Sequence, residues 1–197
     1  MSKQLHIDPA KSALLVMDYQ NILLENYVPD AGRAALLANA ASLIAAARAA
    51  RMSVIYVMVA FRPGHPEVSP RNTIFSFVKE NGLFLRDQPG TAIHSDVAPL
   101  DGETVILKQR VGAFGGTDLQ TVLRSSGVET LVLTGITTGG VVLSTVRQAF
   151  DLDYRLLVAR DCCADPDSDV QEVLLDKIIA QHAEVVSAQQ VIDAMSA

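Results

Sequence analysis

Residues 134–149, TGITTGGVVLSTVRQA, decide the fold of this chain, because a buried strand ends there at small residues and a helix begins at once. The apolar run at 131–133 is typical of a parallel strand covered on both faces. After it, apolar side chains recur at helical spacing through residues 142–150. Glycines permit close backbone approach, and the N–H groups of a first helical turn favour negative charge. We therefore expect a site for an oxyanion or a carboxylate at this turn.

The same alternation of strand and helix continues along the chain. Near-continuous apolar runs predict strands, and helical spacing predicts helices between them. The predicted strands lie at 12–19, 53–61, 104–114, 131–133, 154–167 and 183–188. The predicted helices lie at 32–51, 73–80, 118–127, 142–149, 168–181 and 189–195. This order predicts βαβ units with right-handed crossovers. We expect one domain over residues 1–197, a three-layer, doubly wound (Rossmann-like) α/β domain with a mostly parallel sheet of about six strands.

Composition restricts the partners. A net charge of −6 and the lack of any Lys/Arg-rich run argue against nucleic acid and anionic membranes. No apolar run approaches the roughly 20 residues that span a bilayer, and no signal peptide is recognisable, so we expect a cytoplasmic protein. The adjacent cysteines Cys162 and Cys163 suit a reducing compartment. The expected partner is a small molecule or another copy of the chain.

Two charged residues end predicted strands. Asp18 closes the run at 12–19, and Lys108 marks the point where the strand at 104–114 leaves the core. Open α/β sheets bind ligands at this carboxyl edge. Taken alone, Asp18 is more typical of a turn or a helix cap than of a catalytic site, and Lys108 is more typical of a solvated side chain. Beside Asp18, Lys108 would hold the carboxylate ionised or stabilise charge that develops on a substrate.

These residues resemble the motifs of the isochorismatase-like, or cysteine hydrolase, superfamily. Asp18 and Gln20 match its D-x-Q motif. Its lysine motif is matched by Lys108, Phe114, Thr117 and Leu119, and its motif G-x-x-T-x-x-C-V-x-x-T-x-x-x-A by Gly135, Thr138, Val142, Thr145 and Ala149. The resemblance implies Asp18 and Lys108 as catalytic residues. The neighbouring residues expected to bind substrate or an oxyanion are Gln20, Phe61, Arg62, Arg110, Thr137, Thr138 and Gly140.

The chain departs from the family at the nucleophile, because the cysteine position holds Val141. Valine can neither attack a carbonyl nor pass a proton. One hypothesis is a hydrolase of vinyl ether or amide C–O or C–N bonds that works without a thiol: family members lacking the cysteine use the Asp to protonate an enol carbon, and water then attacks. Val141 is bulkier than the glycine that those members usually carry and narrows the pocket. The alternative is an inactive pseudoenzyme that binds a small ligand. A third hypothesis assigns thiol chemistry to Cys162 or Cys163, which otherwise serve as buried scaffold.

The irregular segment 62–99 is rich in proline and glycine, and in the family this insertion helps to form the pocket wall. Arg62 and Arg71 would then meet an anionic substrate, or else are solvated surface charges. No D-x-H or close His pair is present, so we predict no metal, and no glycine-rich phosphate motif is present, so we predict no cofactor. The resemblance further implies a homo-oligomer and a cis peptide between Thr137 and Thr138.

Overall fold

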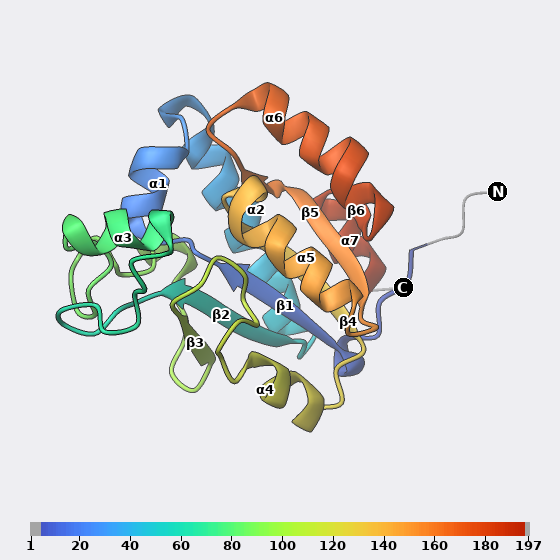
Figure 1. Ribbon diagram of the computed structural model, residues 1–197. Coiled ribbons are helices and arrows are strands. Elements are labelled where there is room, and N and C mark those ends of the chain that lie inside the picture. The colour runs from blue at the N-terminus through green and yellow to red at the C-terminus, as the bar shows by residue number, and fades with distance from the viewer. Residues whose placement is uncertain (1–4, 196–197) are drawn as a thin grey trace.

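The computed structural model describes residues 5–195 and contains one parallel sheet of six strands in the order β3-β2-β1-β4-β5-β6 (Figure 1). The strands are β1 Ser12–Met17, β2 Ser53–Val59, β3 Thr104–Lys108, β4 Thr130–Ile136, β5 Arg155–Ala164 and β6 Glu184–Val186. All the pairings are parallel. The predicted fold class is confirmed.

Helices cover both faces of the sheet because the central strands are apolar on both sides. Every residue of β1 is buried, and its alternate side chains enter opposite cores, as the twofold repeat of a strand requires. Leu14 and Val16 pack with α2 (Asp30–Ala49) and α7 (Ala188–Met195) on one face. Leu15 and Met17 pack with α4 (Leu119–Ser125) and α5 (Leu143–Phe150) on the other face. Figure 1 shows α5 in front of the sheet and α2 behind it.

The strand order fixes where a site can form. From β1 the chain crosses to β2 and β3 on one side of the sheet, and it then returns to β4 on the other side of β1. The crevice between the carboxyl ends of β1 and β4 is therefore the topological switch point, where open α/β sheets bind ligands. Two helices lie beside this edge, α1 (Asn21–Tyr27) and α3 (Thr73–Glu80), as Figure 1 shows.

Local structure differs from the sequence expectations in several places. The strand β3 ends at Lys108, whereas the expected strand extends to residue 114. The expected helix at 168–181 is instead α6 (Ser168–Val173) followed by the π-helix η4 (Leu174–Ile178) and the short 3-10 helix η5 (Ile179–Gln181). The helix α1 begins at Asn21, after residues 18–20, and was not predicted. The cis peptide bond lies between Ile136 and Thr137, one bond before the expected Thr137–Thr138 position, so that expectation was wrong.

The remaining short elements are η1 (Pro9–Lys11), η2 (Ser95–Val97) and the π-helical turn η3 (Thr138–Val142). Within residues 5–195, no helix combines the length and the apolar character needed to cross a membrane.

Candidate active site

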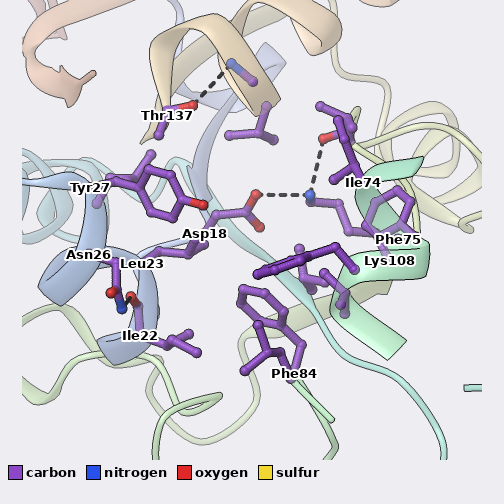
Figure 2. A pocket seen from close by; sticks show the side chains of 18 residues that line it. Asp18, Ile22, Leu23, Asn26, Tyr27, Ile74, Phe75, Phe84, Lys108 and Thr137 are labelled. Carbon is purple, nitrogen blue, oxygen red and sulfur yellow. Dashed lines mark hydrogen bonds and ion pairs between the residues drawn. The ribbon is translucent and has the colours of Figure 1, made fainter. Parts of the chain in front are cut away.

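Asp18 and Lys108 meet at the carboxyl edge of the sheet. Asp18 follows β1 directly and has a φ of 61°, a left-handed conformation that Asp tolerates better than most residues. Lys108 is the last residue of β3, and its Nζ lies 2.8 Å from Asp18 Oδ2 (Figure 2). The Lys108 side chain is 1% exposed and that of Asp18 is 5% exposed. The two groups predicted to be catalytic therefore form a buried ion pair.

The two residues of this ion pair differ in the hydrogen-bonding capacity that remains for a ligand. The Lys108 ammonium donates to Asp18 Oδ2, to the Arg110 carbonyl at 3.1 Å and to the Val111 carbonyl at 3.0 Å. An ammonium has three donors, so Lys108 is saturated. Asp18 Oδ1 is buried and has no hydrogen-bond partner. The oxygen that remains for a ligand is thus Asp18 Oδ1.

Burial changes the acidity of Asp18. Loss of solvation raises the pKa of the Asp18 carboxyl above its ordinary value, and the neighbouring Lys108 charge and hydrogen bond reduce this rise without cancelling it. The protonated form of Asp18 is therefore more accessible than that of a carboxyl group in water. An acid catalyst near neutral pH needs such a shift.

A cavity of about 700 Å³ opens beside the ion pair. Figure 2 shows the Asp18 carboxyl group among the lining side chains, with the Tyr27 hydroxyl pointing toward it. The polar lining residues besides Asp18 and Lys108 are Asn26, Tyr27 and Thr137. Most of the other lining side chains are apolar: Ile22, Leu23, Val59, Ile74, Phe75, Phe77, Val78, Leu83, Phe84, Val111, Ile136 and Val141, with Gly140 beside them. The size is that of a site for a small molecule.

The turn after β4 forms part of the cavity wall through Thr137, Gly140 and Val141. Thr137 caps η3, and its Oγ1 accepts from the Gly140 amide at 3.1 Å. The Gly139 amide donates to Asp165 Oδ2 at 2.9 Å. Both amides are therefore used within the protein. Val141, which the sequence resemblance matches to the family's cysteine, lines the cavity with a branched apolar side chain.

Five of the sequence-predicted site residues line this cavity: Asp18, Lys108, Thr137, Gly140 and Val141. Gln20 does not, although it belongs to the same motif as Asp18. Its Nε2 donates to the carbonyls of Val59 and Thr91 at 2.9 and 2.7 Å, and its Oε1 accepts from the Val59 amide at 2.8 Å. Gln20 is fully buried and ties the end of β2 to the segment around Thr91. Thr138 is also fully buried outside the cavity lining.

The remaining predicted residues lie behind or beside the cavity wall. Phe61 is fully buried and packs against Phe75, with their ring centroids 5.6 Å apart. Arg62 pairs with Glu67 at 2.7 Å, and Arg110 Nη1 donates to the Glu67 and Gln109 carbonyls at 3.3 and 2.6 Å. Neither arginine lines the cavity, because the loop that follows β2 offers both of them partners of its own.

The two cysteines also lie outside the cavity lining. Cys162 and Cys163 are free, buried thiols near the end of β5. Burial raises the pKa of the Cys163 thiol to about 12 and also raises that of Cys162. Neither thiol is an available nucleophile in this geometry. In residues 5–195 no group of three or more His, Cys, Asp or Glu side chains is arranged to hold a metal ion.

The helix α1 supplies a wall that the sequence reasoning missed. Ile22, Leu23, Asn26 and Tyr27 all line the cavity. Their spacing, i, i+1, i+4 and i+5, places them on one face of a helix, and this was the signal available in the sequence. It was missed because the apolar run is only one turn long.

Comparison with known proteins shows the family of this chain. The isochorismatase domain family matches residues 12–190. The chain is 29% identical to maleamate amidohydrolase of Pseudomonas putida, over 91% of this chain and 84% of that protein. It is 30% identical to an uncharacterized isochorismatase family protein of Bacillus subtilis, over 89% of each.

The chain is also similar to solved structures of isochorismatase-type and cysteine hydrolases. A cysteine hydrolase from Pseudomonas syringae pv. phaseolicola superposes with a TM-score of 0.86 at 27% identity, over 100% of this chain and 99% of that one. An isochorismatase family protein from Burkholderia thailandensis gives a TM-score of 0.83 at 27% identity, over 99% and 100%. This chain therefore belongs to the isochorismatase family of hydrolases.

Proposed function

We propose that this protein hydrolyses a C–O or C–N bond of a small molecule by acid–base chemistry of Asp18, without a thiol nucleophile. The observation that carries the proposal is the asymmetry of the Asp18 carboxyl group. Lys108 holds Oδ2, while Oδ1 has no protein partner and Asp18 lines the cavity. A buried carboxyl oxygen without a partner is costly in a protein with no use for it.

A vinyl ether would be hydrolysed in three steps. Protonated Asp18 delivers its proton from Oδ1 to the enol carbon, which leaves an oxocarbenium ion and an ionised Asp18 beside Lys108. Water attacks the cationic carbon and returns a proton to Asp18. The hemiketal then collapses to a ketone and an alcohol. Lys108 stabilises the carboxylate that forms in the first step and fixes its orientation.

An amide is the second bond type, and the name of the Pseudomonas putida relative, an amidohydrolase, supports including it. Ionised Asp18 would take a proton from water as the water oxygen attacks the carbonyl carbon. It would then pass this proton to the departing nitrogen as the C–N bond breaks, which leaves a carboxylic acid and an amine or ammonia. The Gly139 and Gly140 amides are already hydrogen-bonded, so the side-chain donor that this turn offers to the developing oxyanion is the hydroxyl of Thr137, which lines the cavity.

The test is a hydrolysis screen of purified protein on isochorismate, uncharged aryl vinyl ethers and small amides and carbamates, with detection of ketone or pyruvate and of ammonia. Asp18→Asn and Lys108→Met are assayed beside the wild type. Turnover that both substitutions abolish supports the proposal. Binding of a compound without turnover of any substrate instead supports the pseudoenzyme alternative, for which the valine at the nucleophile position is the argument. Assembly into a homo-oligomer and a cytoplasmic location stay predictions.

A further inference from the structure

We infer that the substrate of this cavity is an uncharged, mainly apolar molecule, and that carboxylate-bearing compounds are excluded. The inference rests on the proposed function in taking the cavity beside Asp18 as the substrate site. It goes further by naming the chemical class that the walls accept.

The walls are apolar on the sides away from the ion pair. Ile22 and Leu23 come from α1, Phe75 and Val78 from α3, and Phe84 and Val111 from the two loops that follow β2 and β3. Apolar walls gain free energy by burying apolar ligand surface. The polar groups Asn26, Tyr27 and Thr137 are uncharged and suit single hydrogen bonds.

The charges of the site disfavour an anion. In the part of the chain that the structure describes, Lys108 is the one cationic side chain lining the cavity. Its three N–H donors go to Asp18 Oδ2 and to two carbonyls, so none remains for a ligand carboxylate. The Asp18 carboxyl group, when ionised, repels a second carboxylate in the same cavity.

Arg62 and Arg110 do not change this lack of a cationic partner for an anion. Arg62 and Arg110 both turn to Glu67, Arg62 to its carboxylate and Arg110 to its carbonyl. A ligand carboxylate would therefore lose its hydration without gaining a cationic partner. Such a loss weighs against binding far more than a missing apolar contact does.

The test uses matched pairs of amides that differ only in one carboxylate. Hexanamide is compared with 6-amino-6-oxohexanoate, and 3-phenylpropanamide with 3-(4-carboxyphenyl)propanamide. Calorimetry on the wild-type protein measures the affinity of each. We expect the uncharged member of each pair to bind at least about tenfold more tightly, the ratio that corresponds to 1.4 kcal/mol.

A gain-of-charge variant tests the cause. Asn26 is exposed and lines the cavity, and its Nδ2 donates to the Ile22 carbonyl four residues earlier at 2.7 Å. Asn81 is exposed and makes the same kind of bond to the Phe77 carbonyl at 2.8 Å, but it does not line the cavity. Asn26→Arg is expected to improve binding of both carboxylate amides at least about fivefold, whereas Asn81→Arg leaves it unchanged.

The outcomes separate this inference from the proposed function. Equal or tighter wild-type binding of the carboxylate members overturns the inference, even if they are hydrolysed at Asp18. Failure of both uncharged amides to bind also overturns it, as does an equal response to Asn26→Arg and Asn81→Arg. Preferential binding of the uncharged amides, without turnover of any substrate, contradicts the proposed hydrolysis and supports the inference.

Discussion

Lys108 Nζ lies 2.8 Å from Asp18 Oδ2 although β2 separates the two strands that carry these residues. Two strand spacings amount to about 10 Å, so Lys108 reaches Asp18 only by extending across the end of β2. The left-handed backbone at Asp18 and the bond from its amide to the Val57 carbonyl at 2.8 Å place the carboxyl group at that end. The ion pair between Asp18 and Lys108 thus connects the carboxyl ends of β1 and β3 across the end of β2.

The ion pair makes the two residues energetically coupled. Lys108→Met leaves Asp18 buried without its partner and is expected to lower the free energy of unfolding by about 3–5 kcal/mol. The double variant Asp18→Asn/Lys108→Met removes both charges and is expected to lose clearly less. Urea unfolding of the wild type, the two single variants and the double variant measures the coupling. If the single effects simply add, the pair is not coupled and this interpretation fails.

The raised pKa of Asp18 predicts the pH dependence of stability. The native state binds the Asp18 proton more tightly than the unfolded chain, whose Asp pKa is about 3.9. The contribution of the Asp18 carboxyl group to the free energy of unfolding is therefore fully present below the unfolded-state pKa. It is lost as the pH rises through the native pKa of Asp18. The unfolding free energy of the wild type minus that of Asp18→Asn should fall with rising pH. Asp101→Asn, at an exposed residue outside the cavity lining, is the matched control for the substitution itself. A difference that instead rises with pH would mean that Lys108 outweighs burial and that Asp18 is a poor acid.

Gln20 is predicted to be a structural residue. Gln20→Ala leaves the Val59 amide and two carbonyls without partners and is expected to cost about 2–4 kcal/mol of unfolding free energy. Any effect of Gln20→Ala on KM should result from this loss of stability. It should therefore disappear at low temperature, where the variant stays folded. Thermal unfolding, with exposed Gln148→Ala as control, measures the cost. A raised KM with unchanged stability would show that Gln20 binds substrate instead.

The cysteines are predicted to be dispensable for turnover. Cys162→Ala and Cys163→Ala remove buried thiols that do not line the cavity, so kcat is expected to change by less than about twofold while stability falls by about 1 kcal/mol. Alkylation of the native wild type should be slow because both thiols are buried and protonated. Loss of kcat in either variant, without unfolding, would establish the thiol hypothesis.

Much of this architecture could be predicted from the sequence, because apolar runs and helical spacing are local features that indicate strands and helices. The β1 and β3 runs end in Asp18 and Lys108, and parallel strands bring their carboxyl ends to one edge. The helix at 73–80 was predicted with its observed limits because Phe75 and Val78 repeat at helical spacing.

The roles of individual residues at the site depend on contacts between segments that are far apart in the sequence. The spacing of residues along the chain does not show such contacts. Gln20 and Asp18 are two residues apart and the chain turns sharply between β1 and α1, so one enters the cavity and the other ties down β2. Arg62 is close to the site in sequence, but Glu67 holds it away. The sequence likewise showed that Lys108 lies at a strand end. It did not show that all three N–H donors of Lys108 would be hydrogen-bonded within the protein.

The most direct test of the account is the ratio of kcat/KM between wild type and Asp18→Asn on the best substrate of the hydrolysis screen. Asn keeps the shape of the side chain and removes the transferable proton. We predict a fall of at least about 100-fold, the usual contribution of an acid–base group, and no change for Asp101→Asn. Retention of wild-type kcat/KM by folded Asp18→Asn would contradict the central claim that Asp18 is the acid.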